Sequence, residues 1–384
     1  MFSSSAARSA RISPIFSASF DAWPQRLRAA WLLPLFLVSG VDAVAQPVAS
    51  APAVPPNRPA SAPSQPVGAL WQGMLDEKTS IALTIFREPA EGAPLPAEAV
   101  GERTSDRRER VAGTVRYGPV PAAGRLLLEG AAPQQGRIDW RVWEVGLDEQ
   151  GHAFRREAGR LVGRLERDGR SIAGEWTGAG GAQPLPVSLR QAAQYREQVF
   201  QRDNVTLTER YPVTGDAAID KLIQTMRMTA CRAGMVECRN GIEIAWLDRE
   251  RVSLLRTFWF FSGGAHGNST YAAGNWRKTS QGYESVTLGD ILDTTPACRD
   301  TLNRRLVDVL RRQGASQAPA GALDDKAWRN AGLPFVWYGK GVVMYYAPYA
   351  VGPYVQGSFR APVGFAQLGA CVRGEPARQD EEKG

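Results

Sequence analysis

Residues 256–268, RTFWFFSGGAHGN, are the most constrained stretch of this 384-residue chain. Large apolar side chains at consecutive positions predict a strand that is covered on both faces and buried between two layers. Three glycines then end the run, and glycines at such a place either allow a positive φ in a tight turn or let another group come close. We expect His266 and Asn268 to lie on this turn, which makes it a candidate binding site. The glycines are Gly263, Gly264 and Gly267.

Residues 68–191 show several short runs in which apolar and polar side chains alternate, with turn residues between them. This period of two is typical of strands that are buried on one face. The pair Asp168-Gly169 is the strongest hairpin signal in the series. We therefore predict an all-β N-terminal domain, either an antiparallel barrel or a sandwich.

Residues 202–373 mix strands with helices and predict an α+β domain with an antiparallel sheet and two helices. One helix is expected at residues 216–228, and a second begins after a cap at Asp293 or Thr294, with Pro296 in its first turn. The pattern also predicts a short connecting helix at 192–201, a short strand at 286–288, a hairpin at 335–346 and a last strand at 355–363.

The two ends of the chain have compositions that predict no folded core. Arg26 and Arg28 precede a short apolar run at 29–38, and Ala43-Val44-Ala45 matches a signal peptidase site, so residues 1–45 are expected to be a signal peptide. The run is too short for a stable transmembrane anchor, although an uncleaved segment stays open. Residues 46–67 form a Pro/Ala-rich linker expected to be disordered, as is the tail at 374–384. The expected location is the periplasm or the extracellular medium.

All four cysteines lie in the second half of the chain, which fits disulfides in an exported protein. The spacing favours one bridge between Cys231 and Cys238 and another between Cys298 and Cys371, while the two other pairings stay open. A metal site is not expected, because there is no CxxC motif and only one nearby histidine. No cofactor is expected, since no nucleotide-binding fingerprint occurs.

Arginine gives the chain a formal net charge of +7, and its arginines are scattered. Such a surface favours anionic partners in general. No nucleic acid is expected, because no basic motif interleaved with aromatic residues occurs.

Acid–base chemistry depends on two histidines. His152 lies in a polar hairpin and is expected to be solvated. His266 could act as a general base with Ser262 or Ser269, oriented by Asp290 or Asp293, although acidic residues before a helix are usually caps. The absence of a GxSxG elbow favours a structural or binding role for His266, and no catalytic residue is assigned.

Residues 336–354, VWYGKGVVMYYAPYAVGPY, are the second notable stretch. Tyr349 and Tyr354, with prolines between them, could present aromatic faces and hydroxyls to a protein or a sugar. The alternative is that these tyrosines are divided between core and hairpin.

The SGGAHGN turn, the segment VTLGDIL at 286–292 and the YAPYAVGPY segment occur in the order found in a known family. Residues 204–369 resemble the RsiV-like C-terminal domains of lysozyme-sensing extracytoplasmic anti-sigma factors and related exported bacterial proteins. In the best-understood member, the resemblance implies, this domain is not an enzyme and binds lysozyme in its active-site cleft. This chain lacks an anti-sigma segment and adds the N-terminal β domain and the cysteines, so signalling is not implied. The carried-over positions are Gly263, Gly264, His266, Gly267, Tyr349, Gly352, Pro353 and Tyr354.

The sequence thus predicts an exported bacterial envelope protein, more a binding module than an enzyme. The expected partner is a lysozyme-like protein or a peptidoglycan fragment, and the expected binding residues are Gly263, Gly264, His266, Asn268, Tyr349 and Tyr354. The alternative is a periplasmic hydrolase of envelope glycan or peptide with His266 as general base. Both readings require the histidine turn and the tyrosine segment to be neighbours.

Overall fold

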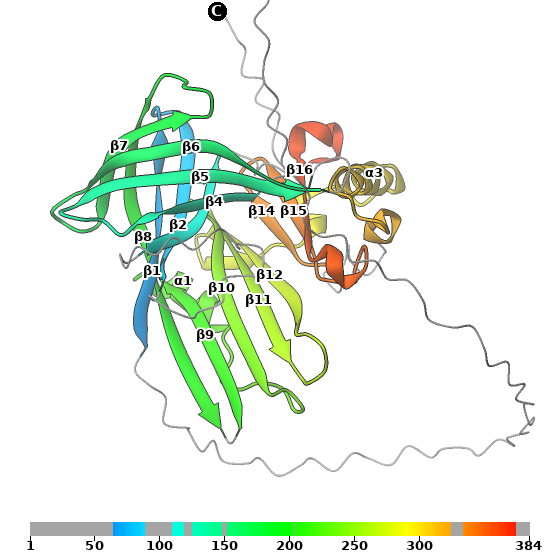
Figure 1. Ribbon diagram of the computed structural model, residues 1–384. Coiled ribbons are helices and arrows are strands. Elements are labelled where there is room, and N and C mark those ends of the chain that lie inside the picture. Colours follow the sequence, from blue (N-terminus) through cyan, green and yellow to red (C-terminus); the bar gives the residue numbers. More distant parts are fainter. Residues whose placement is uncertain are drawn as a thin grey trace, which may run out of the picture. The chain divides into compact units, whose positions relative to one another are not determined.

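The computed structural model describes residues 64–88, 110–118, 125–147, 152–202, 204–323 and 333–373. The predicted signal peptide, most of the predicted linker and the predicted tail lie outside these ranges. Within them, one sheet of thirteen strands runs in sequence order, and its first eight strands close into a barrel because β1 also pairs with β8 (Figure 1). The sequence left barrel and sandwich open, and the closing β1–β8 ladder decides for the barrel.

All eight barrel strands pair antiparallel with their neighbours. Alternating side chains fill the barrel interior, and Leu83, Leu128, Val142 and Leu161 are among the completely buried ones. The interior is thus a packed core. The strands are β1 (Gln65–Leu75), β2 (Thr79–Glu88), β3 (Arg110–Tyr117), β4 (Arg125–Ala131), β5 (Arg137–Leu147), β6 (Ala153–Leu165), β7 (Ser171–Gly178) and β8 (Leu185–Arg202).

Strand β8 continues beyond the barrel and starts the second part of the sheet. It pairs with β9 through residues 194–202, so the predicted connecting helix at 192–201 is wrong. Its alanine and glutamine residues favour a helix locally, but ladders with β1 and β9 override that preference. The described residues belong to one compact unit, and the predicted split into two domains is not confirmed. The other strands are β9 (Val205–Val213), β10 (Glu237–Leu247), β11 (Arg251–Phe261), β12 (Asn268–Thr279) and β13 (Gly282–Ser285).

The second part of the sheet is mixed, which corrects the prediction of an antiparallel sheet. Strands β9 and β10 are parallel because α1 (Ala217–Gln224) lies in the connection between them and lets the chain return in the same direction. The helix starts, as predicted, at the Asp216 cap, whose side chain accepts from the backbone of Ala218 and Ile219. Its buried residues pack with Ile242 and Leu254 of the sheet.

The helices near residue 290 also differ from the prediction. Leu288 begins a one-turn helix, α2 (Leu288–Ile291), because Thr287 and Asp290 form a capping box, so the predicted strand at 286–288 is wrong. The long helix α3 (Pro296–Arg312) is capped at Thr295 instead of Asp293 or Thr294. The described residues thus contain three α-helices where two were predicted. No described helix has the length and apolar character of a bilayer span.

A small antiparallel sheet of three strands packs against α3 on one side and against β10–β12 on the other (Figure 1). The hairpin of β14 (Phe335–Tyr338) and β15 (Gly341–Tyr346) is confirmed. The last strand, β16 (Phe359–Gly364), is shorter than predicted, because residues 354–356 form a 3-10 turn. The short 3-10 helices are η1 (Ala318–Gly321), η2 (Tyr354–Gln356), η3 (Phe365–Gln367) and η4 (Gly369–Cys371).

Buried side chains of the large sheet hold the edge of β14 in place. The Asn275 amide donates to the Phe335 carbonyl at 3.0 Å and accepts from the Trp337 N–H at 2.8 Å. The Ser253 hydroxyl donates to the Trp337 carbonyl. These bonds satisfy a strand edge that would otherwise be buried without partners.

We expect Asn275→Ala to lower the free energy of unfolding by about 3 kcal/mol, because it leaves a buried carbonyl and a buried N–H without partners. Urea denaturation measures this change. Thr270→Ala, at an exposed position of the same strand, is the control and should change stability by less than about 0.5 kcal/mol. Equal effects of the two substitutions would contradict this role for Asn275.

Candidate functional site

The fold brings the histidine turn and the tyrosine segment together. Residues 262–267 connect β11 to β12, and residues 347–353 leave β15. Since the small sheet packs on the face of the large one through Leu255, Val336 and Val343, the two connections meet. The rings of His266 and Tyr354 stack with their centroids 3.7 Å apart and their planes at 16°. We call His266, Tyr349 and Tyr354 the aromatic cluster.

The carbonyl of Gly267 is the centre of the cluster. It accepts a hydrogen bond from the Tyr354 hydroxyl at 2.8 Å and one from His266 Nδ1 at 2.9 Å. Because a carbonyl oxygen can only accept, Nδ1 carries the hydrogen. In the neutral ring Nε2 is then the acceptor for the Tyr349 hydroxyl, 3.3 Å away. The imidazole is thus fixed on both nitrogens and on one face.

Gly267 is required because the Trp259 indole lies against it. A Cβ at this position would lie 2.4 Å from the indole ring. The glycine lets the turn rest on Trp259, and Arg239 lies over the same indole at 4.9 Å. Trp259 therefore supports the cluster, a role that the sequence reading did not assign.

Strand β11 is less covered than predicted. Its first half is buried on both faces, as at Leu254 and Leu255, but Trp259 and Phe261 are only half-buried. The small sheet covers Leu255 and stops before the end of the strand. The aromatic end of β11 thus reaches the surface beside the cluster.

Tyr349 is an exposed member of the cluster. Its side chain is 55% exposed, and its φ of 71° lies in the left-handed region that non-glycine residues avoid. Such a conformation costs about 1–3 kcal/mol, and residues held in it cluster at active sites and ligand-binding segments. The ring lies 5.5 Å from that of Tyr354 and presents its surface to solvent.

Gln356 fixes the tyrosine segment to the end of α3. Its side chain accepts from the Ser316 hydroxyl at 2.9 Å and donates to the Gly314 carbonyl at 2.9 Å. A Cβ on Gly352 would lie 1.9 Å from the same side chain, which explains the glycine there. The segment is thus anchored at its C-terminal end, after Tyr349.

The remaining predicted binding residues shape the turn. Gly263 and Gly264 are exposed and have φ values of 91° and 97°, so their role is to allow the backbone conformation of the turn. The Asn268 side chain accepts from the Ser269 N–H at the start of β12. Pro353 is the cap of η2. In this geometry, only His266 and the two tyrosines present side-chain chemistry at the surface.

The contacts of His266 differ from those that a general base paired with a serine and a carboxylate would have. Within the described part of the chain, its hydrogen bonds go to the Gly267 carbonyl and the Tyr349 hydroxyl, and to no serine or carboxylate. Asp290 accepts from Thr287, which lowers the pKa of its carboxyl, and Asp293 accepts from the Thr295 N–H. Asp290 is therefore part of the cap of α2, and Asp293 bonds to Thr295, the residue that caps α3. His152 is exposed just before β6.

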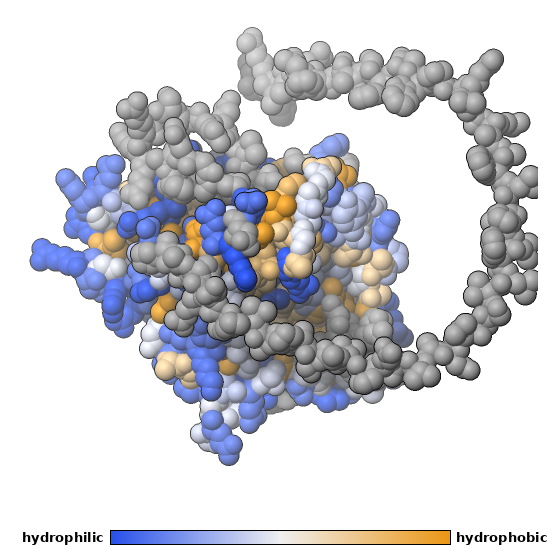
Figure 2. All heavy atoms as spheres, turned by 90° about the horizontal axis from the view of Figure 1, so that it is seen from below, coloured by the Kyte–Doolittle hydropathy of each residue, from blue (hydrophilic) through white to orange (hydrophobic). Residues whose placement is uncertain are grey.

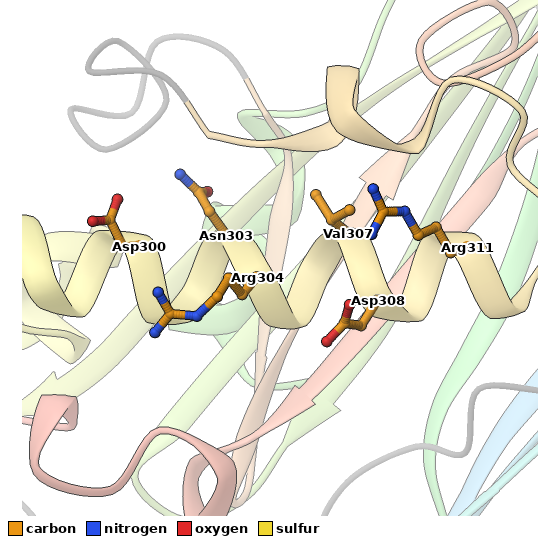
Figure 3. Close-up of a pocket in the computed structure, with 6 residues that line it drawn as sticks. All are labelled: Asp300, Asn303, Arg304, Val307, Asp308 and Arg311. Atoms are coloured by element: carbon orange, nitrogen blue, oxygen red, sulfur yellow. The ribbon is translucent and has the colours of Figure 1, made fainter.

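A shallow hollow runs along the exposed side of α3 (Figure 3). Asn303 and Val307 point to one side of the helix, and Arg304 and Asp308 to the other (Figure 3). The Asn303 side chain forms two hydrogen bonds with the backbone of Leu323, so both its amide nitrogen and its oxygen are engaged within the protein. The hollow is therefore a helix surface without converging polar groups.

Both predicted disulfides are present, Cys231–Cys238 and Cys298–Cys371. The first closes the loop before β10, and the second ties the start of α3 to η4. They are consistent with an exported protein.

Comparison with known proteins gives neighbours in structure only. No family model matches this chain, and no curated protein matches it. Its structural neighbours are DUF3298 proteins. One is a DUF3298 family protein from Pseudomonas aeruginosa PAO1, with 14% identity and a TM-score of 0.34, covering 48% of this chain and 93% of that chain. Another is a DUF3298 family member from Bacteroides fragilis NCTC 9343, with 13% identity and a TM-score of 0.30, covering 48% and 95%.

Proposed function

We propose that this chain is an exported, non-catalytic binding protein of the bacterial envelope and that the aromatic cluster is its binding surface. The observation that carries the proposal is Tyr349, an exposed tyrosine kept in a costly backbone conformation by an anchored segment. Exposed rings with hydroxyls, fixed before the ligand arrives, lose little entropy on binding. Fixed aromatic surfaces of this kind suit both sugar rings and protein side chains.

The charge of the chain favours a peptidoglycan-related ligand over a lysozyme-like protein. The formal net charge is +7, and lysozyme is itself basic, so the two would repel unless local groups compensated. Peptidoglycan fragments carry carboxylates and sugar rings, which match a basic protein with an aromatic surface. Seen from below (Figure 2), hydrophobic residues lie in several separate groups among hydrophilic ones.

We expect Tyr349→Ala to weaken binding to soluble peptidoglycan fragments at least about tenfold, because exposed aromatic residues dominate such surfaces. Titration calorimetry with the purified chain measures the affinity. Tyr117→Ala is the matched control, since Tyr117 is 42% exposed on the barrel and should leave binding unchanged. Equal affinity of the two variants for the fragments would show that the cluster is not the binding surface. Binding of the chain to lysozyme but not to the fragments would favour a lysozyme-like partner.

His266→Ala separates binding from hydrolysis. It removes the Tyr349 contact and the stack on Tyr354, so we expect weaker binding and no change in fragment size over time. Mass spectrometry of the fragments measures any cleavage. A cleavage activity that is present in the natural chain and lost in this variant would support the hydrolase alternative.

A further inference from the structure

The Nε of Arg256 is a buried donor that forms no hydrogen bond within the described part of the large sheet. Arg256 lies on the face of β11 opposite to Trp259, between Leu254 and Phe258, and its Nε is buried without a hydrogen bond. Buried donors nearly always have a hydrogen-bond acceptor. A buried donor without one is therefore a candidate site for an anion.

Arg256 differs from the other arginines whose Nε is buried and unbonded. Arg196 bonds to Ser64 through another nitrogen, and Arg299 and Arg360 each have a further interaction. Among the described residues, Arg256 is the one member of this group with no hydrogen bond, ion pair or ring contact.

Three nearby arginines each have a carboxylate partner. Arg227, next to β10, pairs with Glu209, and Arg239 on β10 pairs with Glu237. Arg251, at the start of β11, pairs with Asp248. Arg256, in the middle of the same strand, has no acidic partner in the part of the chain that the structure describes.

The surroundings of Arg256 make its charge costly. Its cross-strand neighbours are the apolar Ile242 and Ala272, and Leu254 and Phe258 beside it are buried. Burial, followed by repulsion from Arg232, lowers the pKa of the Arg256 guanidinium. A second cation therefore acts on a group that has no anionic partner among the described residues, and an apolar environment strengthens any anion contact made there.

We propose that Arg256, together with the exposed Arg232, binds a phosphate group carried by a ligand. A guanidinium offers a planar fork of N–H donors that fits two oxygens of an oxyanion. Two cations match the charge of a phosphate monoester, about −1.5 to −2 at pH 7, better than that of one carboxylate. The site is on the other face of β11 from the aromatic cluster and is independent of the proposed function.

Thermal unfolding of the full chain tests the site with inorganic phosphate, acetate and chloride at equal ionic strength. Phosphate should raise the midpoint of the natural chain in a saturable way, because a ligand that binds only the folded state stabilises it. Arg256→Met should abolish the rise. Arg239→Met, which removes an arginine that already has a carboxylate, should keep it.

Arg232→Gln provides a second test at an exposed position, where folding is not at risk. It should weaken phosphate binding about tenfold, the loss expected for one charge-assisted contact. An equal phosphate effect in the natural chain and in Arg256→Met would overturn the proposal, as would no phosphate effect in the natural chain. A larger rise with acetate than with phosphate would overturn the assignment of the ligand to phosphates.

Discussion

Glu209→Gln is expected to lower the free energy of unfolding by about 3–5 kcal/mol, the range for breaking a buried ion pair from one side. Glu209 is completely buried in β9. Its carboxylate accepts from Arg227 Nε and Nη2 at 2.9 and 2.8 Å, from the Met228 N–H at 2.6 Å and from the Asn240 amide at 3.0 Å. Every one of these groups is a donor.

Glutamine has the same shape as glutamate but carries an NH2 group where one carboxylate oxygen was. The amide nitrogen would face a donor, and the charge of Arg227 would lose its partner. Arg227 also lies 3.6 Å over the Tyr211 ring and follows the end of α1. The loss should therefore loosen the connection between α1 and β10.

Glu197→Gln is the matched control, because Glu197 pairs with Arg210 where both side chains are 28–39% exposed. Exposed pairs contribute about 1 kcal/mol or less. Urea denaturation of both variants, with the slope checked for constancy, measures the difference. Two small effects, or a larger effect for Glu197, would contradict a central role for the Glu209 network.

The hydrogen-bond partners of the buried Glu209 could not be predicted from the sequence. Its members lie on β9, β10 and the segment after α1, up to 31 positions apart. Glu209 occurs in a run, TLTERYPV, where alternation alone predicts a polar residue facing solvent or a partner. Which partner it finds depends on the parallel β9–β10 pairing, and periodicity does not carry that information. Asn275 and Gln356 were missed for the same reason.

The strand pattern was more informative, because alternation is a local signal. The antiparallel strands of the N-terminal part, as a barrel or a sandwich, and the hairpin of β14 and β15 follow from alternating runs and their turn residues. The prediction of a helix at residues 192–201 failed because their composition favours a helix. They form a strand through ladders with β1 and β9, and local composition does not reveal such pairing. The closing pair of β1 and β8 joins residues more than a hundred positions apart.

The prediction that the histidine turn and the tyrosine segment are neighbours rested on the family resemblance and its paired motifs, and not on periodicity. The structure places Tyr354 on His266, 88 positions away in the chain. The sequence did suggest glycines for close approach, and Gly267 against Trp259 is such a case. It did not suggest the positive φ of Tyr349, because nothing in the residue itself favours it.

Replacing both Cys298 and Cys371 by alanine is expected to lower the free energy of unfolding by about 4 kcal/mol, whereas replacing Cys231 and Cys238 should cost about 2 kcal/mol. The first bridge spans 73 positions and the second spans 7. A longer closed loop removes more conformational freedom from the unfolded chain, so its loss frees more entropy.

The long bridge also supports native contacts that the alanine variant would weaken. The Asp293 N–H donates to the Cys371 carbonyl at 2.7 Å, and the Arg373 N–H donates to the Ile291 carbonyl at 2.7 Å. Urea denaturation of both double variants, with and without reductant, measures the two contributions. Reductant should destabilise the natural chain and leave a variant without either bridge unchanged. A larger loss from the short bridge would show that native contacts, and not loop length, set the stabilisation in this protein.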